Sequence, residues 1–156
     1  MEETVLHPVD RDKITSELTD DHFLRITNKG NNKIYQITNE DAPHVMQEIG
    51  RLRELSYRQI GCGSGKSIDI DEYDVRKDPY YQLVVWDPRQ NEIVGGYRYA
   101  KCSDYIDRVE ELSMSHYFKL SKRFIENILP HSIELGRAWV NPAFQPNAEE
   151  RNQYLP

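Results

Sequence analysis

The feature that most constrains the fold is a pair of apolar segments separated by a short turn. Residues 80–86 and 92–100 are rich in the aromatic and β-branched residues that strands favour. The link between them, Asp87-Pro-Arg-Gln-Asn91, has the composition of a hairpin turn. Because a hairpin pairs its two strands in opposite directions, we expect a sheet that is antiparallel in this part.

Two helices are expected before this hairpin. Residues 10–18 read as a short helix capped by Asp10, and a longer helix begins at a cap on Asp41 with Pro43 in its first turn. The apolar residues of the longer helix recur at helical spacing, so one of its faces is expected to pack inward, with Arg53 at the border of that face. These apolar residues are Val45, Ile49, Leu52, Leu55 and Ile60.

The remaining elements complete a mixed pattern. Composition and periodicity predict a turn at 28–32, a strand at 33–37, a helix at 116–127 and a strand at 133–140. Phe118, Ile125 and Ile128 are expected to face inward from the later helix, and Pro130 is expected to end it. The order helix, strand, helix, strand, strand, helix, strand indicates an α+β fold with a largely antiparallel sheet flanked by helices.

The pattern divides the chain into two regions. Residues 1–32 are expected to form a leader with a short helix, and residues 33–156 hold the sheet and its helices. The last strand has no helix after it, because residues 141–156 are polar and lack periodicity. We therefore expect a domain that is incomplete at its C-terminus, in a chain that forms the front part of a longer protein and is inactive alone.

Composition limits the functions that this chain can have. Its net charge of −6 argues against a nucleic-acid partner, which normally requires a basic surplus. No apolar run approaches the ~20 residues of a transmembrane segment, and the first residues lack the pattern of a signal peptide. Peripheral association with a membrane stays open. Cys62 and Cys102 do not make a disulfide scaffold, so we expect a reduced, cytoplasmic protein.

The glycine-rich segment 61–67 is close to a phosphate-binding loop without matching it. The Walker pattern requires a glycine where Ile60 stands, and a strand rather than a helix before the loop. A mobile active-site loop and an ordinary flexible connection are the two interpretations left open.

No metal site is expected. Asp69, Asp71 and Asp74 lack the glycine and the glutamate that a calcium loop needs at its sixth and twelfth positions. The five histidines are scattered without the spacing of metal ligands. Cys62 has no nearby partner and is interpreted as an incidental thiol.

Two arginines stand inside apolar strand segments. Arg98 follows two glycines and lies between tyrosines, and Arg137 lies among isoleucine, leucine, tryptophan and valine. A buried charge without a partner is strongly destabilising, so each guanidinium needs a carboxylate. Asp71, Asp74 and Glu134 are available, and a closed network of ion pairs would satisfy all five groups. Such networks are often purely structural, so the pattern alone leaves a scaffold and a functional site open.

The spacing of Glu134 and Arg137 indicates an irregular strand. Residues three apart in a regular strand point to opposite faces of the sheet. The two side chains can share a face only if the strand carries an extra residue, and Gly136 is where a bulge would be accommodated at low cost. A bulge would splay this strand from its neighbour and would leave backbone groups facing a cleft.

The pattern of charged residues resembles a known group of enzymes. It consists of Arg53 on a helix, Asp71-x-x-Asp74, Arg98 at a strand end and Glu134-x-x-Arg137. This order is similar to that of the acyl-homoserine-lactone synthases and closer to the ornithine-lipid type N-acyltransferases, often labelled hemolysin-like, of the GNAT superfamily. The resemblance covers about residues 45–145. Its most specific part is Glu-Leu-Gly-Arg followed by Val-x-Pro, with the upstream Asp-x-x-Asp.

The resemblance implies a GNAT-like fold and an acyl transfer that serves lipid biosynthesis. The donor would be a fatty acyl thioester on the phosphopantetheine arm of acyl carrier protein, or acyl-CoA, and no metal would take part. The acceptor would be the amine of a small amino acid such as glycine or ornithine. Glu134 would be the general base with Arg137 as a second catalytic residue. The residues expected to bind substrate or donor, or to brace the site, are Arg53, Asp71, Asp74 and Arg98.

The chain also departs from this group. Tyr57 stands near the position where a phenylalanine usually follows the helix arginine, and the coenzyme-A signature of GNAT enzymes is absent from residues 141–156. The second departure favours a carrier-protein donor, or a site completed by further sequence. Two alternatives remain, namely an acetyl-CoA-dependent N-acetyltransferase and a non-catalytic domain that binds a lipid or a protein partner.

Overall fold

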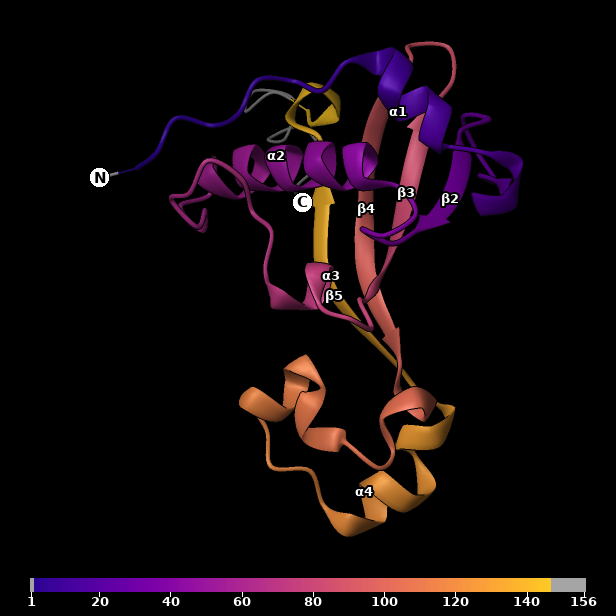
Figure 1. Cartoon of the computed structure of the whole chain (residues 1–156), viewed down its shortest axis with the longest axis vertical. Coiled ribbons are helices and arrows are strands. Elements are labelled where there is room, and N and C mark those ends of the chain that lie inside the picture. Colours follow the sequence, from indigo (N-terminus) through magenta and orange to yellow (C-terminus); the bar gives the residue numbers. More distant parts are fainter. Residues whose placement is uncertain (1, 147–156) are drawn as a thin grey trace, which may run out of the picture.

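A five-stranded antiparallel sheet, in the order β1-β2-β3-β4-β5, is the frame of the computed structural model, which describes residues 2–146 (Figure 1). Its strands are β1 (Phe23–Ile26), β2 (Lys33–Ile37), β3 (Tyr81–Asp87), β4 (Glu92–Lys101) and β5 (Ile133–Val140). The α-helices are α1 (Arg11–Glu17), α2 (Pro43–Arg58), α3 (Glu72–Val75) and α4 (Lys122–Asn127). Short 3₁₀ helices are η1 (Asp20–His22), η2 (Cys102–Tyr105), η3 (Val109–Glu111), η4 (Ser113–His116), η5 (Leu129–His131) and η6 (Pro142–Phe144). The expected α+β class is confirmed.

The central hairpin of β3 and β4 is confirmed, with β5 added on its far side. Two glycines let β4 approach both neighbours closely. A Cβ atom on Gly95 would lie 2.6 Å from the Trp139 carbonyl oxygen of β5, and one on Gly96 would collide with the Leu83 carbonyl of β3. The Gly-Gly pair is therefore required by strand packing, quite apart from any role next to Arg98.

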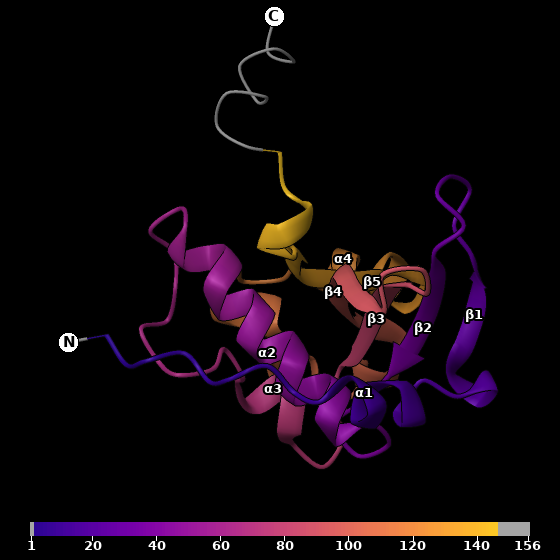
Figure 2. The ribbon, with the colours of Figure 1, turned by 90° about the horizontal axis from the view of Figure 1, so that it is seen from above.

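Helix α2 lies across one face of the sheet and covers the main core (Figures 1 and 2). Val45, Ile49 and Leu52 face inward as expected, but Leu55 is only partly buried and Ile60 lies beyond the end of the helix and is exposed. The main core contains Val9, Ile14, Leu18, Tyr35, Ile37, Ala42, Val45, Met46, Ile49, Leu52, Val84, Trp86, Ile93 and Trp139.

The expected cap of α2 on Asp41 is wrong. Ala42 is the capping residue, and the Asp41 carboxylate instead accepts a hydrogen bond from the Thr38 N–H (2.7 Å). The helix is capped by a carboxylate from another helix, because Glu17 at the end of α1 accepts from the His44 and Val45 N–H groups (3.2 and 2.9 Å). A negative charge at this position also suits the positive end of the helix.

Residues 102–132 form a small lobe at the lower end of the sheet (Figure 1). The expected helix at 116–127 is wrong in its first half, because Ser121 caps α4 by accepting from the Phe124 N–H (3.2 Å), so the helix begins only there. Phe118 and Ile128 are exposed rather than inward, whereas Ile125 packs against the lobe core. Pro130 lies within η5 instead of ending α4. The lobe core contains Tyr73, Tyr80, Ala100, Cys102, Tyr105, Leu112 and Leu129.

One strand and one α-helix were not expected from the sequence. Strand β1 lies inside the 1–32 region and pairs with β2, so that region contributes to the sheet as well as supplying α1. Helix α3, one turn long, lies in the acidic stretch before β3. Residues 147–156 of the polar stretch that began at 141 lie outside the described residues.

Candidate active site

A network of three arginines and three aspartates lies where α2, α3, β4 and β5 meet, and we call it the arginine–aspartate network. Its members are Arg53, Asp69, Asp71, Asp74, Arg98 and Arg137. At its centre the fully buried Arg53 of α2 donates to Asp74 Oδ2 (2.6 Å) and to the Asp69 carbonyl oxygen (2.5 Å). The helix border position expected for Arg53 is therefore deep inside the protein, where a guanidinium requires these partners.

The Asp71-x-x-Asp74 spacing forms the cap of α3. Asp71 is the capping residue and accepts from the Tyr73 N–H (3.0 Å), while Asp74 Oδ2 accepts from the Asp71 N–H (3.1 Å). This reciprocal arrangement fixes both carboxylates relative to one another. The other oxygen of Asp74 accepts from Gln82 Nε2 (2.9 Å) and Arg98 Nη1 (3.1 Å).

Asp71 bridges the two strand arginines. Arg98 Nη1 donates to Asp71 Oδ1, and Arg137 Nη2 donates to Asp71 Oδ2 (3.0 Å). Burial opposes ionisation of Asp71, but the hydrogen bonds and charges of Arg98 and Arg137 outweigh it and lower its pKa. The carboxylate is thereby held ionised between two cations, one from β4 and one from the edge of β5.

Strand β5 carries an extra residue, and this bulge brings Arg137 into the network. Tyr97 of β4 faces two residues of β5, because the pairing shifts between Gly96 and Arg98. The bulge was expected at Gly136 and lies just after it, and Arg137 adopts the left-handed backbone conformation (φ 48°). A non-glycine residue in that region is strained, and such strain is concentrated at functional sites. The Tyr57 hydroxyl of α2 donates to the next carbonyl, that of Ala138 (3.1 Å).

Asp69 belongs to the network, although the sequence reasoning did not select it. Its side chain is buried, and its Oδ2 lies 3.5 Å from Arg53 Nε and 3.3 Å from Arg137 Nη1 without a hydrogen-bond partner among the described residues. Burial raises its pKa more than the two arginines lower it. The alternation Ile68-Asp-Ile-Asp71 was the available signal, because in extended chain alternate residues point the same way.

Glu134 lies on the same face of the sheet as Arg98, and its carboxylate is hydrogen-bonded by residues of the lobe and its core. Its Oε2 accepts from the Tyr80 hydroxyl (2.8 Å), and its Oε1 accepts from the Met114 N–H (2.7 Å) at the start of η4. The Tyr80 hydroxyl in turn accepts from the Ser113 N–H (3.0 Å). Burial and the nearby Glu134 raise the pKa of Tyr80, so this phenol remains a donor. Each oxygen of Glu134 keeps capacity for a further hydrogen bond.

Tyr80 joins Glu134 to the network, because its hydroxyl donates to Glu134 and its ring packs against Arg98. The Arg98 guanidinium lies over the rings of Tyr73 (5.3 Å) and Tyr80 (5.6 Å), and Arg76 stacks on the same two rings at 5.0 and 4.9 Å. These cation–π contacts hold Arg98 between carboxylates and aromatic faces. Its Nε is nevertheless buried without a hydrogen-bond partner among the residues described here.

A pocket of about 450 Å³ opens between α3, the end of β4, the bulge and η4. It is lined by Asp71, Glu72, Tyr73, Arg98, Ser113, His116, Tyr117, Gly136 and Arg137. The structure thus brings Asp71, Arg98 and Arg137 to its wall, with Arg53 and Asp74 behind them. Glu134 is near the pocket without lining it. His116 is a further titratable group on this wall, which the scattered pattern of histidines in the sequence did not reveal.

The glycine-rich loop 61–67 is tied to α2. The buried Glu54 carboxylate accepts from the N–H groups of Ser64 and Gly65 (both 2.9 Å) and from Arg58 Nε (2.7 Å). Burial opposes ionisation of Glu54, but Arg58 and the loop donors outweigh it and lower its pKa. The amides that a phosphate-binding loop would offer are therefore occupied by a carboxylate of the protein itself.

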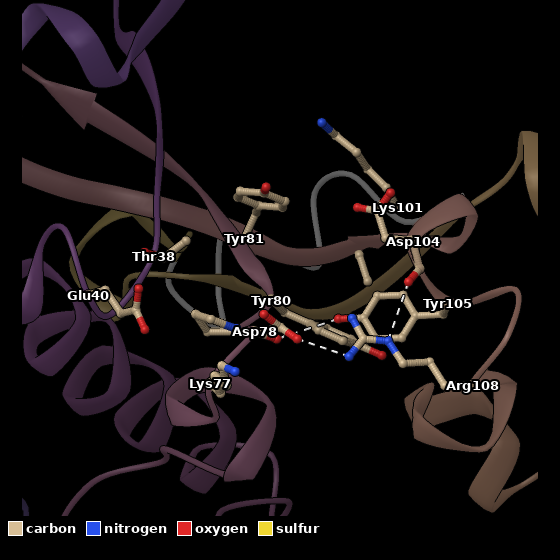
Figure 3. A pocket seen from close by; sticks show the side chains of 12 residues that line it. Thr38, Glu40, Lys77, Asp78, Tyr80, Tyr81, Lys101, Asp104, Tyr105 and Arg108 are labelled. Atoms are coloured by element: carbon tan, nitrogen blue, oxygen red, sulfur yellow. Dashed lines mark hydrogen bonds and ion pairs between the residues drawn. The ribbon is translucent and has the colours of Figure 1, made fainter.

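A second pocket, of about 310 Å³, lies between the residues after β2, the start of β3 and η2 (Figure 3). Three of its charged residues are engaged with neighbours, since Arg108 pairs with Asp78 (2.9 Å) and Lys101 lies over the Tyr81 ring (5.5 Å). No strained backbone and no buried unpartnered group marks this pocket within residues 2–146. We therefore assign no function to this second pocket.

Within the described part of the chain, no group of three or more histidine, cysteine, aspartate or glutamate side chains is arranged to hold a metal ion. Helices long and apolar enough to cross a bilayer are likewise not found in residues 2–146.

Two curated proteins are similar to this chain, and both are named glycine N(alpha)-acyltransferase. The protein from Bacteroides thetaiotaomicron is 49% identical over 148 residues, which are 92% of this chain and 43% of that protein. The protein from Phocaeicola vulgatus is 46% identical over 147 residues, which are 92% of this chain and 45% of that protein. The chain therefore spans less than half the length of the curated relatives it matches.

The family described as acetyltransferase (GNAT) domain matches residues 52–151, which contain the network, β3, β4 and β5. No solved structure matches the chain significantly. The antiparallel sheet with α2 across one face agrees with the GNAT-like fold that the arginine and acidic motifs led us to expect. On the family match and the identity to both relatives, this chain belongs to the acetyltransferase (GNAT) domain family.

Proposed function

We propose that the protein containing this chain is an N-acyltransferase that moves a fatty acyl group from a thioester to the amine of glycine. The names of the two relatives support glycine as the acceptor. The observation that carries the proposal is the bulge at Arg137, which gathers Arg137, Asp71 and Arg98 around one pocket and leaves Glu134 on the same strand face. A purely structural ion network would not require a strained arginine on the pocket wall.

The amine of an amino acid is protonated at neutral pH and must lose a proton before it attacks a thioester. Glu134 is the proposed general base, acting directly or through a water molecule, because Tyr80 and the Met114 N–H fix its carboxylate beside the pocket. His116 on the pocket wall is a second candidate, since a neutral imidazole can also accept a proton. The expelled thiolate takes up a proton, so the reaction yields an amide and a free thiol.

The arginines suit the carboxylate of the acceptor. Arg137 is about one third exposed and is shared between Asp69 and Asp71, so it can add a hydrogen bond to a ligand at the pocket. Charge-assisted hydrogen bonds from guanidinium groups are the usual means of binding a carboxylate. We propose that Arg137, with Arg98 beside it, orients glycine so that its amine faces the donor carbonyl. Backbone N–H groups of the bulge would stabilise the oxyanion, each by roughly 3 kcal/mol.

The donor is proposed to reach the bulge from the other face of the sheet. An apolar groove of about 390 Å³ lies there, lined by Val85, Val94, Gly95, Gly96, Tyr97, Ala138, Trp139 and Val140. Its lining fits a pantetheine arm or an acyl chain better than a charged ligand. Acyl carrier protein is the proposed carrier and acyl-CoA the alternative, in a pathway of lipid biosynthesis of the ornithine-lipid or hemolysin-like type. A cytoplasmic location belongs to the proposal, because the described cysteines, Cys62 and Cys102, are both free.

The test uses the full-length protein that contains this chain, assayed by mass spectrometry for N-acylglycine. Wild type is incubated with glycine or ornithine and with acyl carrier protein thioester, acyl-CoA or acetyl-CoA. Glu134→Gln is expected to lower kcat by about 10²–10⁴-fold, the usual contribution of a general base. His116→Gln is the matched comparison, and a larger loss there with near-normal Glu134→Gln turnover would transfer the role to His116. Product from acetyl-CoA alone would favour the N-acetyltransferase, and no product from any pair would favour a binding domain.

A further inference from the structure

The chain that follows η4 runs into α4 in the lower part of the lobe (Figure 1). We call residues 117–123, which include the first two residues of α4, the aromatic–basic segment. Tyr117 is 79% exposed and Phe118 is 67% exposed, although aromatic side chains of this size are usually buried. Lys119, Lys122 and Arg123 are exposed beside them. Two solvated rings and three cations thus lie within seven residues of a protein whose net charge is −6.

The cations of this segment are little used by the protein. Lys122 Nζ lies 3.6 Å from Glu126 Oε1, in a pair that is open to solvent and hence weak. Lys119 and the guanidinium of Arg123 have no ion pair or side-chain hydrogen bond to any residue in 2–146. The stretch 117–128 holds three cations against one carboxylate, Glu126. These charges are therefore available to an external anionic partner.

The segment is continuous with the candidate active site. Tyr117 lines the pocket that contains Arg98 and Arg137, and His116 just before it lies edge-on to the Tyr73 ring at 6.2 Å. A partner that contacts the segment would lie at the mouth of that pocket. The hairpin of β1 and β2 also exposes Leu24, Ile26 and basic residues, but it lies at the opposite edge of the sheet from β5.

We propose that the aromatic–basic segment docks the protein on the surface of an anionic lipid bilayer. Basic side chains are attracted to anionic headgroups, and aromatic rings favour the interface between headgroups and acyl chains. The bilayer satisfies both kinds of side chain. The role of this docking in the reaction rests on the proposed function: a fatty acyl product formed in the pocket would pass directly into the membrane.

The experiment measures sedimentation of the chain and of the full-length protein with vesicles of phosphatidylcholine containing roughly one third phosphatidylglycerol. No donor or acceptor is present, so the binding result is independent of the proposed reaction. Lys119→Gln/Lys122→Gln/Arg123→Gln is expected to weaken binding about a hundredfold, and Phe118→Ser about tenfold. Tyr117 is left unchanged because it lines the pocket. Turnover on soluble substrates should be unchanged in both variants.

The matched control is Arg25→Gln/Lys29→Gln/Lys33→Gln in the β1–β2 hairpin, which removes the same charge far from the pocket. Binding by this variant should stay within about twofold of wild type. The proposal is overturned if wild type does not bind anionic vesicles, if the hairpin variant loses as much binding as the segment variant, or if Phe118→Ser has no effect. Binding of acyl carrier protein through the same cations, without vesicle binding, would also overturn it.

Discussion

Two of the clusters of buried charge on α2 differ in how completely their hydrogen-bonding groups are satisfied. One is the arginine–aspartate network around Arg53. The other, which we call the Glu48 cluster, consists of Arg11, Glu48, Arg51 and Glu92. Both join α2 to distant segments through carboxylates, and both contain fully buried members, Arg53 and Glu48. The two clusters are alike in residue type, because each consists of arginines and carboxylates.

The Glu48 cluster is closed. Glu48 accepts from Arg51 through both oxygens (2.7 and 2.8 Å), from Arg11 (3.1 Å) and from the Val9 N–H (3.1 Å). Burial opposes ionisation of Glu48, but these donors outweigh it and lower its pKa. No side-chain atom of the cluster is buried without a partner in the described chain, and no pocket described there is lined by these residues. It fastens the N-terminal segment and β4 to α2.

The arginine–aspartate network is open. Asp69 Oδ2 and Arg98 Nε lack hydrogen-bond partners in residues 2–146, Arg137 is strained, and the network reaches a pocket wall. Unsatisfied buried groups and strain reduce stability, so their retention is explained better by ligand binding than by folding. The comparison shows that a structural cluster and a candidate site have the same residue types and differ in whether buried polar atoms lack hydrogen-bond partners.

The largest expected effect comes from removing a buried carboxylate. Asp74→Asn leaves Arg53 and Arg98 with reduced compensation in the interior and should lower the free energy of unfolding by about 3–5 kcal/mol. Glu48→Gln should cost less, about 2–3 kcal/mol, because Arg11 and Arg51 are more exposed to solvent than the arginines that Asp74 compensates. Urea unfolding of the chain gives both values.

Activity of the full-length protein separates the two clusters further. Under conditions in which both variants are folded, Asp74→Asn should lower kcat because it displaces Asp71 and Arg98. Glu48→Gln should retain wild-type turnover. Equal losses of turnover in the two folded variants would show that the comparison between a closed and an open cluster is mistaken.

Asp69 of the network and Glu48 should make contributions to stability that respond to pH in opposite directions. The pKa of Asp69 is raised above its ordinary value of 3.8, so its contribution to stability is present below that pH and is lost as pH rises through the folded pKa. The pKa of Glu48 is lowered from 4.5, so its contribution is present above that pH and is lost as pH falls through the folded pKa. Each slope can reach about 1.4 kcal/mol per pH unit.

Urea unfolding of wild type, Asp69→Asn and Glu48→Gln at stepped pH values from the acid range to neutrality measures these slopes. The stability of wild type relative to Asp69→Asn should fall as pH rises from about 4. Relative to Glu48→Gln it should rise over the corresponding acid range. Parallel slopes for the two variants would mean that Asp69 is compensated as fully as Glu48.

The sequence predicted the parts of the fold that depend on local composition. The hairpin of β3 and β4, strand β2 and strand β5 follow from alternating apolar residues and turn chemistry. The need of Arg98 and Arg137 for carboxylates also follows from the sequence, because burial of a charge has only a few solutions.

Most of the errors concern interactions made across the chain, and one concerns a local cap. The cap of α2 is Glu17 from another helix, and a neighbouring Asp41 offered a plausible local substitute. Helix α4 begins after Ser121 rather than at residue 116, because the Ser121 hydroxyl accepts a hydrogen bond from the Phe124 N–H and caps the helix there. The bulge lies just after the expected Gly136, and its left-handed residue is Arg137, whose guanidinium contacts with Asp69 and Asp71 offset the backbone preference for glycine.

The strain at Arg137 can be measured by comparing two truncations. Arg137→Gly and Arg137→Ala both remove the guanidinium and should both abolish most turnover. Only glycine adopts a φ of 48° freely, so Arg137→Gly should be more stable than Arg137→Ala by about 1 kcal/mol. Equal stabilities by urea unfolding would mean that the bulge relaxes without its arginine and that no strain is held there.

The smallest effect is expected at Tyr57, whose hydroxyl joins α2 to the bulge of β5 beside the arginine–aspartate network. Tyr57→Phe removes the hydrogen bond to the Ala138 carbonyl and should lower stability by about 0.5–1 kcal/mol. Because burial raises the pKa of Tyr57, the hydroxyl remains a donor at neutral and mildly alkaline pH, so this loss should not change over that range. Turnover should fall by less than about fivefold, since the bulge keeps its pairing with β4 and its contacts with Asp71. A loss of turnover as large as that of Arg137→Gly would show that the phenol, rather than the guanidinium, holds the bulge in its active geometry.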